Sequence, residues 1–252
     1  MPSKKDLLRK FLSGIETGDA MAAAVVNEEK YIQHNPQTHE GSEGIAALFA
    51  RLSTTSPKVT FMRVFEDGDF AFAHNEYDFA SVRAAFEVFR FEDGRAVEHW
   101  DNIQPIADLN PSGRGMLDGS TEITDLDKTE INRAFVRDFV SDVMIDRRLD
   151  MLPHYLDNDL IQHNPVLGDG IAALRFALEG TNGGNLIVRY KRLHRVLAEG
   201  NFVLCVSEGA RYGEHSSFYD LFRVANDLIV EHWDTIEAIP PRSEWKNENG
   251  KF

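Results

Sequence analysis

The stretch Glu98-His99-Trp100-Asp101 decides the fold, because it returns later in the chain as Glu231-His232-Trp233-Asp234. A longer phrase, Tyr31-Ile32-Gln33-His34-Asn35-Pro36, returns as Leu160-Ile161-Gln162-His163-Asn164-Pro165. Both phrases recur in the same order at nearly the same separation, about half the chain. A period as long as a domain predicts two tandem copies of one domain rather than a solenoid.

Composition limits the class of protein. The 252 residues carry 27 Lys and Arg against 41 Asp and Glu, a formal net charge of -14. Such an acidic surface repels phosphate backbones and anionic lipids, so we expect no nucleic-acid partner and no membrane partner. The single cysteine, Cys205, excludes an intrachain disulfide and a zinc-thiolate site, and we interpret it as a small buried residue.

The amino-terminal residues suggest an amphipathic helix and not a signal peptide, because Asp6, Arg9 and Lys10 interrupt the apolar stretch. No run of residues approaches the roughly 18 apolar residues that span a membrane. We therefore expect a cytoplasmic protein.

Each half reads as helices followed by strands, which predicts an α+β fold with helices on one face of a strongly curved, mainly antiparallel sheet. The expected segments are a first domain (1–107), a linker rich in Pro, Gly and Ser (108–124), a second domain (125–240) and a polar tail lying loose or across the surface (241–252). The expected helices are 6–18, 20–29 and 42–52, then 127–144, 148–156 and 170–178. The expected strands are 59–65, 70–77, 84–91 and 96–106, then 186–196, 202–208, 217–224 and 228–239.

The last strand of each half offers a candidate site. Side chains alternate with a period of two, so His99 and Asp101 share a face, as do His232 and Asp234. On a concave face, each pair would place a carboxylate beside an imidazole in an apolar cavity, which suits general acid/base catalysis. Glu87 and Asp220 each stand three residues from an arginine, and we expect these charges to pair across strands or with solvent.

Further candidates lie outside the last strand. His34 and His163 precede Asn-Pro, where they either hold the turn or enter the pocket. His74 has Val206 as its counterpart, so only the first pocket would contain it. Trp100 and Trp233 either pack on the sheet or contact substrate.

These motifs resemble SnoaL-like proteins of the nuclear transport factor 2-like superfamily, which are also called polyketide cyclase-like. The resemblance covers nearly the whole chain, once per half. It implies two tandem cone-shaped α+β barrels with deep pockets, packed as an intrachain pseudo-dimer, with further homo-oligomers possible. It also implies cofactor-free intramolecular aldol condensation in which Asp101 and Asp234 act as acid/base. His34 and His163, with His99 and His232, would assist.

The first hypothesis is therefore a cofactor-independent acid/base enzyme acting on a small, largely apolar carbonyl compound by cyclisation or isomerisation. The second is a hydrolase or dehydratase using the same Asp and His groups. The third is a ligand-binding or assembly module without catalysis, since one fold hosts many functions. A metal site built from His34, His99 and Asp101 is a fourth, since two imidazoles and a carboxylate suit zinc or iron.

Overall fold

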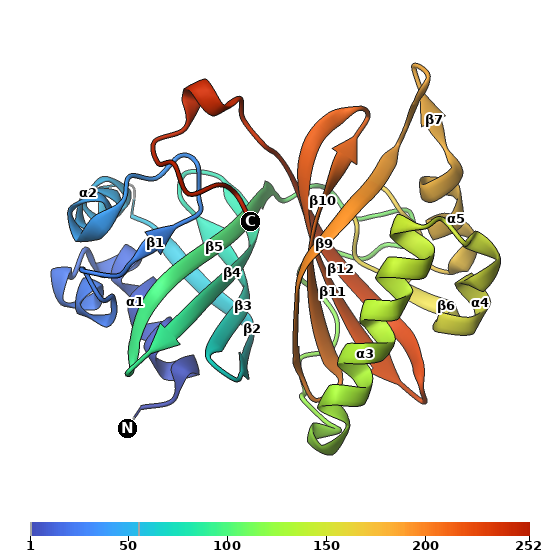
Figure 1. Cartoon of the computed structure of the whole chain (residues 1–252), viewed down its shortest axis with the longest axis horizontal. Helices are drawn as coiled ribbons and strands as arrows, with labels where there is room; N and C mark the ends of the chain where they lie inside the picture. Colours follow the sequence, from blue (N-terminus) through green and yellow to red (C-terminus); the bar gives the residue numbers. More distant parts are fainter. Residues whose placement is uncertain (1, 55) are drawn as a thin grey trace. The chain divides into compact units, whose positions relative to one another are not determined.

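The computed structural model describes residues 2–54 and 56–252, and the chain packs as two units. Unit 1 comprises Met1–Pro105 and Ile239–Phe252, and unit 2 comprises Ile106–Ala238. The segment expected as a linker therefore packs as part of unit 2, and the expected polar tail packs as part of unit 1 (Figure 1). The packing of the two copies as a pseudo-dimer stays a prediction.

Unit 1 places two helices on one face of a five-stranded sheet whose order is β1-β5-β4-β3-β2 (Figure 1). Strand β1 runs parallel to β5, and the other neighbours are antiparallel. Its elements are α1 (Lys4–Thr17), a 3-10 helix (Ala20–Val25), β1 (Ile32–Gln33), α2 (Gly41–Ser53), β2 (Lys58–Asp67), β3 (Phe70–Asp78), β4 (Val82–Glu92) and β5 (Arg95–Pro105).

Unit 2 repeats this arrangement with the sheet order β6-β12-β11-β10-β9, in which β6 runs parallel to β12. Its helical elements are a 3-10 helix (Leu126–Lys128), α3 (Thr129–Phe139), a π-helical turn (Val140–Ile145), a 3-10 helix (Leu149–Met151), α4 (Leu152–Tyr155) and α5 (Ile171–Glu179). Its strands are β6 (Leu156–Gln162), the short pair β7 (Thr181–Asn182) and β8 (Asn185–Leu186), β9 (Val188–Glu199), β10 (Phe202–Arg211), β11 (Glu214–Ala225) and β12 (Leu228–Ala238). The α+β class is confirmed, with two open mixed sheets instead of closed barrels.

Local sequence explains the ends of the elements. Ser3 caps α1, since its Oγ accepts from the Asp6 backbone N–H at 3.1 Å and Asp6 bonds back to the Ser3 N–H. Asp93 and Gly94 both have positive φ between β4 and β5, as a tight hairpin of twisted strands requires. These features explain why α1 begins at Lys4 and why a tight turn joins β4 and β5.

The two cores pack alike between helices and sheet. Phe11 of α1 meets Phe89 of β4 edge to face at 5.2 Å between ring centres. Phe139 of α3 meets Phe222 of β11 in the same way at 5.5 Å. The same aromatic contact at the same place in both sheets supports one packing scheme used twice.

Some of the expected helices differ from the structure in type and extent. The helix expected at 20–29 is a 3-10 helix confined to Ala20–Val25, where Asp19 caps the Met21 N–H. The helix expected at 127–144 begins at Thr129 and passes into a π-helical turn at Val140–Ile145. The expected mainly antiparallel sheets are observed, with β1 and β6 as their parallel edge strands. No helix among the described residues is long and apolar enough to cross a membrane.

Candidate functional site

The last strand of each unit separates two sets of polar side chains. In β5, His99 stacks on Phe89 of the core at 4.3 Å, whereas Trp100 stacks on His34 at 4.7 Å. In β12, His232 stacks on Phe222 and Trp233 stacks on His163. The expected alternation is confirmed. We call the face that carries His99 and His232 the inner face, and the other the outer face.

The inner face of unit 1 holds a chain of buried hydrogen bonds. His99 Nδ1 lies 2.9 Å from Gln33 Oε1, and His99 Nε2 lies 2.6 Å from Glu87 Oε2. The Tyr77 hydroxyl donates to Glu87 Oε1 at 2.7 Å. All four side chains are at least 90% buried, so their bonds act in a medium of low dielectric constant.

Unit 2 contains the same chain. His232 Nδ1 lies 2.9 Å from Gln162 Oε1, and His232 Nε2 lies 3.1 Å from Asp220 Oδ1. The Tyr190 hydroxyl donates to Asp220 Oδ1 at 2.9 Å. Sequence reasoning had Glu87 and Asp220 pairing across strands, and each does so, with the histidine of the next strand.

The proton positions on the histidine follow from the glutamine. Gln33 Oε1 also accepts from the backbone N–H of Asn35 at 2.9 Å, so it is the amide oxygen that faces His99 Nδ1. Nδ1 therefore carries a proton, and proton exchange is confined to the Nε2–carboxylate contact. Burial raises the pKa of Glu87, and the bond from His99 opposes that rise. Burial also raises the pKa of Tyr77 and Tyr190 well above the usual value, so both remain protonated donors.

A second carboxylate stands beside each histidine, as expected. Asp101 is 4% exposed and Asp234 is 5% exposed, so neither points into bulk water. The motif asparagine holds each one: Asn35 Nδ2 donates to Asp101 Oδ2 at 2.6 Å, and Asn164 Nδ2 donates to Asp234 Oδ2 at 2.7 Å. The amide, not the imidazole, of each His-Asn-Pro motif thus reaches the aspartate.

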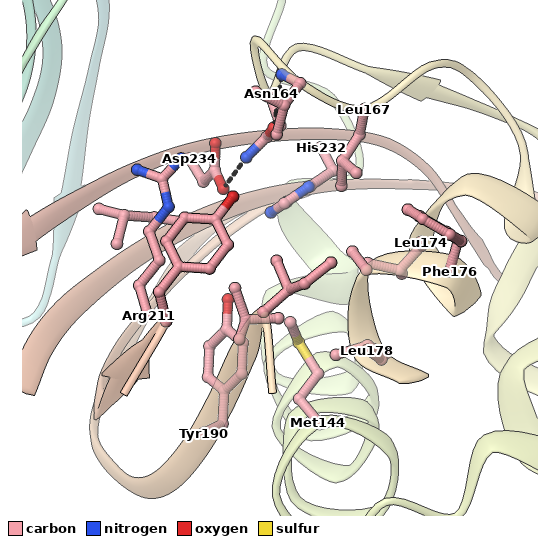
Figure 2. A pocket seen from close by; sticks show the side chains of 16 residues that line it. Met144, Asn164, Leu167, Leu174, Phe176, Leu178, Tyr190, Arg211, His232 and Asp234 are labelled. Carbon is pink, nitrogen blue, oxygen red and sulfur yellow. Dashed lines mark hydrogen bonds between the residues drawn. The ribbon is translucent and has the colours of Figure 1, made fainter. Parts of the chain in front are cut away.

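Asp234 faces a cavity of about 160 Å³ in unit 2. Figure 2 shows Asp234, His232 and Asn164 at its polar side, with Met144, Leu174 and Leu178 among the apolar residues lining it. Asp234 Oδ1 has no hydrogen-bond partner among the described residues. Burial raises the pKa of Asp234, while His232 and the Asn164 bond act in the opposite direction.

Asp101 is in a different state, because the carboxy-terminal segment reaches it. Lys251 is 3% exposed, and its Nζ lies 2.8 Å from the Asp101 carbonyl oxygen and 3.5 Å from Oδ1. Asn247 anchors the segment by donating to the carbonyls of Asn35 and Thr38. The tail was expected to lie loose or across the surface, whereas it delivers a buried ammonium group to the first aspartate.

His34 and His163 were expected among the pocket residues, and the structure places them on the outer face instead. His34 Nε2 lies 3.0 Å from Glu98 Oε1 and its Nδ1 lies 2.8 Å from the Gly250 carbonyl oxygen. The cause is register: Gln33 stands opposite His99 in the β1–β5 pair and shares its face, so the next residue points away.

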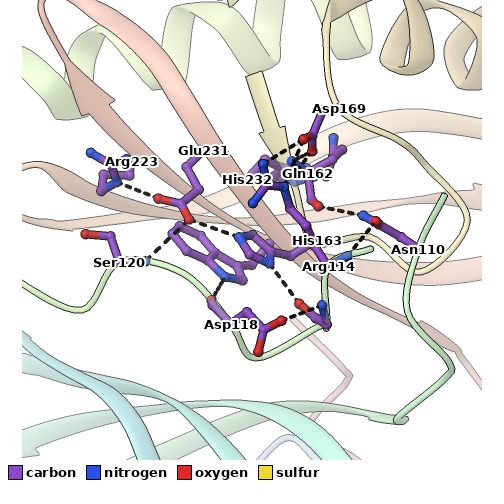
Figure 3. A network of polar contacts seen from close by, with 12 residues as sticks. Asn110, Arg114, Asp118, Ser120, Gln162, His163, Asp169, Arg223, Glu231 and His232 are labelled. Atoms are coloured by element: carbon purple, nitrogen blue, oxygen red, sulfur yellow. Dashed lines mark hydrogen bonds and ion pairs between the residues drawn. The ribbon is translucent and has the colours of Figure 1, made fainter. Parts of the chain in front are cut away.

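His163 repeats these contacts in unit 2, where Figure 3 shows the network around it. Its Nε2 lies 2.9 Å from Glu231 Oε1 and its Nδ1 lies 2.8 Å from the Gly115 carbonyl oxygen. Trp233 donates to the Asp118 carbonyl oxygen at 2.8 Å. A Cβ at Gly119, where φ is +90°, would collide with Glu231, His163 and Trp233. The backbone of the segment that was expected to be a linker therefore packs directly on the network.

The other residues expected to contact substrate also lie outside the pocket. Trp100 and Trp233 lie on the outer face, stacked on the histidines. His74 is 1% exposed, stacks on Phe86 at 4.3 Å and receives a bond from Arg63 Nη1 at 3.1 Å. His74 neighbours Ala73 of the inner core in β3, so alternation places it on the outer face.

The groups that could hold a metal differ from the expected set. Glu87, His99 and Asp101 offer ligand atoms within 4.8 Å of one another, and Asp220, His232 and Asp234 do the same in unit 2. His34 is absent from the first group because it lies on the outer face. In both groups the histidine already bonds through each ring nitrogen, so a cation would have to displace a carboxylate or the glutamine.

Sequence reasoning overlooked the glutamine, the asparagine and the tyrosine of each inner face. Gln33 and Asn35 carried a signal, since both residues recur in the second copy as Gln162 and Asn164. The tyrosines carried no such signal, because Tyr77 lies in β3 and Tyr190 lies in β9.

Comparison with known protein families supports the expected SnoaL-like domain in the first copy. Residues 8–99 match the family model of a SnoaL-like domain. This match covers less than half of the chain and lies within unit 1. A search of curated proteins found no match.

Several solved structures resemble part of the chain. TsrD from Streptomyces laurentii is 23% identical, with 41% of this chain and 91% of that chain covered and a TM-score of 0.36. A candidate ketosteroid isomerase from Kribbella flavida DSM 17836 is 19% identical, with coverages of 45% and 84% and a TM-score of 0.38. An LEH-like epoxide hydrolase from M. tuberculosis is 19% identical, with coverages of 44% and 85% and a TM-score of 0.34.

Proposed function

We propose that unit 2 carries a cofactor-free acid/base site that moves a proton on a small carbonyl compound, by isomerisation or aldol-type cyclisation. The proposal depends on the surroundings of one atom, Asp234 Oδ1. It is buried, has no partner among the described residues, and belongs to a side chain that lines an apolar cavity. A carboxylate of raised pKa in such a place suits a general base near neutral pH.

Cavity size indicates the size of the substrate. A buried apolar cavity of roughly 150 Å³ accommodates benzene, and the cavity of unit 2 measures about 160 Å³. The reacting part of the substrate is therefore about as large as one six-membered ring. Met144, Leu174 and Leu178 hold its apolar part and keep water from the reacting carbon.

Asp234 would take a proton from the carbon next to the carbonyl, and the electron pair would pass to the carbonyl oxygen to give an enolate. Return of the proton to another carbon completes an isomerisation. Attack of the enolate carbon on a second carbonyl, followed by protonation of the alkoxide, completes a cyclisation. Asn164 holds Oδ2, so that Oδ1 is presented to the substrate.

The role of His232 differs from the one first expected. Both of its ring nitrogens are bonded, to Gln162 and Asp220, so it is not a free donor to the substrate. It acts instead by its charge, which lowers the pKa of Asp234 against the effect of burial. His232 is thus a positioning residue and Asp234 the base.

Unit 2 is proposed as the working site because Asp101 of unit 1 already faces a cation. Lys251 holds Asp101 as a paired carboxylate, whereas Asp234 has a free oxygen. The SnoaL-like match in residues 8–99 therefore falls on the copy whose aspartate is neutralised. We propose that the second copy has the same SnoaL-like origin and retains the activity.

The test uses cyclohexanone, a ketone of the size of the cavity. Exchange of its α-hydrogens for solvent deuterium is followed by NMR with the full-length protein. We expect Asp234→Asn to slow exchange by about 10²–10⁴-fold, the usual contribution of a positioned base, and the matched Asp101→Asn to exchange as the wild type does. Equal rates for wild type and Asp234→Asn, or no exchange above buffer by the wild type, would overturn the proposal. Opening of cyclohexene oxide to the diol without ketone exchange would assign the base to water activation instead.

A further inference from the structure

One arginine, Arg211, lies at the rim of the unit 2 cavity. Arg211 lines the cavity, and its guanidinium makes no ion pair or hydrogen bond with any residue of the described ranges. Its guanidinium carbon lies over the ring of Tyr212, 5.4 Å from the ring centre. Such a group offers five donors in a planar fork that fits a carboxylate.

Among the half-buried arginines of unit 2 that the structure describes, this lack of a partner is unusual. Most other arginines of unit 2 pair with carboxylates, among them Arg114, Arg133, Arg137, Arg148, Arg175 and Arg223. Asp234 is near enough for Arg211 to lower its pKa, yet the two form no ion pair within 4.0 Å. Figure 2 shows the guanidinium at the polar side of the cavity together with Asp234.

The backbone holds Arg211 in place. It is the last residue of β10 and stands opposite Glu214 of β11 and Val188 of β9. Tyr212 and Gly213 turn the chain with positive φ, and the Tyr212 N–H donates to the Ile187 carbonyl oxygen at 2.9 Å. Because the backbone of Arg211 is already fixed, binding has to order only its side chain, which limits the entropic cost.

In unit 1 a different residue places a positive charge near the aspartate. Counted from the first residues of β3 and β10, Phe70 and Phe202, the position of Arg211 is occupied by Phe79. Phe79 stacks on Tyr77 at 4.7 Å and packs against the core of unit 1. There the cation comes from the buried Lys251. Each aspartate thus has a cation nearby: Lys251 is buried and contacts Asp101, whereas Arg211 is half-exposed and pairs with no carboxylate among the described residues.

We infer that Arg211 binds an anionic head group, so that the substrates of this pocket are carboxylate-bearing compounds with an apolar ring or short chain. The carboxylate lies on the guanidinium at the rim, and the apolar part enters the cavity past Asp234. The inference rests on the proposed function for the identity of the site, but it concerns binding and is measured without turnover.

The test compares benzoate with benzamide, which have the same ring and differ in charge. Titration calorimetry with the full-length protein at pH 7 should show benzoate binding about tenfold more tightly than benzamide, the effect of one charge-assisted bidentate contact. Arg211→Met should abolish this preference. Arg192→Met, which removes the same charge from an exposed position of β9, should keep it. Higher salt should weaken the preference, since Arg211 is only half-buried.

Asp234→Asn separates this inference from the proposed function. The variant should retain or improve benzoate binding, because a like charge is removed, while ketone exchange is lost. An unchanged preference in Arg211→Met, or no preference in the wild type, overturns the inference. A preference that depends on Arg211 with unchanged exchange in Asp234→Asn overturns the proposed function alone.

Discussion

Replacement of Lys251 by Met tests whether the carboxy-terminal segment stabilises unit 1 through its charge. The Nζ–Oδ1 distance to Asp101 is 3.5 Å, and both side chains are at most 5% exposed. At an effective dielectric constant of about 20, two unit charges at this distance attract by about 5 kcal/mol. Desolvation offsets part of that attraction, but the variant leaves a buried carboxylate without its cation. We therefore expect a loss of about 3 kcal/mol in the free energy of unfolding.

Urea denaturation followed by circular dichroism measures the loss, and Lys246→Met, an exposed lysine of the same segment, serves as the control. A double-mutant cycle with Asp101→Asn isolates the pair, since the coupling energy should be about 1–3 kcal/mol if the two charges interact. Wild-type stability in Lys251→Met, or a coupling energy near zero, would refute the reasoning. The segment would then be held by Asn247 and its other hydrogen bonds alone.

Three further outcomes follow from the same contacts. Asp234→Asn should be more stable than wild type at pH 7. Burial raises the folded-state pKa of Asp234, so ionisation of its carboxyl group costs stability as the pH rises above about 4. Urea titrations at pH 3 and pH 7 should therefore show the gain only at pH 7. Tyr190→Phe should cost about 1–2 kcal/mol by removing the donor to buried Asp220, and an unchanged urea midpoint would contradict this. His163→Ala should lower the melting temperature without changing ketone exchange; a fall in exchange rate at full stability would return His163 to the site.

Sequence alone predicts the architecture well where the rules are local. Alternation along β5 and β12 gives the faces of His99, Asp101, His232 and Asp234 correctly, because the period of a strand does not depend on its neighbours. The expected strands at 84–91 and 96–106 are both observed, and they pair antiparallel on either side of Asp93-Gly94.

The errors come from pairings between residues far apart in the chain. The face of His34 depends on the parallel register of β1 with β5, which no local pattern reveals. The Lys251 contact joins residues 150 positions apart, and a lysine in a polar tail normally lies in solvent. Recurrence marked the His-Asn-Pro motif as important, but it could not separate the asparagine that holds the aspartate from the histidine that binds the outer network.

The tyrosines show which feature of the inner face both copies keep. In unit 1, Tyr77 of β3 stands opposite Val59 of β2. In unit 2, Gly209 of β10 occupies the corresponding position, and its strand partner in β9 is Tyr190.

The phenol has thus moved to the neighbouring strand, yet it donates to the same carboxylate position, Glu87 in one unit and Asp220 in the other. Gly209 allows the tyrosine to lie on β9 beside it, because a Cβ at this position would collide with the Arg189 carbonyl oxygen and approach Phe218 to 2.9 Å. Inheritance of one tyrosine from a common ancestral domain does not explain this pattern, because the hydrogen bond is present in both units while its donor lies on a different strand. The physical reason is that a buried carboxylate bonded to an imidazole needs a further donor. The phenol, carboxylate, imidazole and amide therefore form one unit that orients the inner face, and the aspartate beside it is free to differ between the copies.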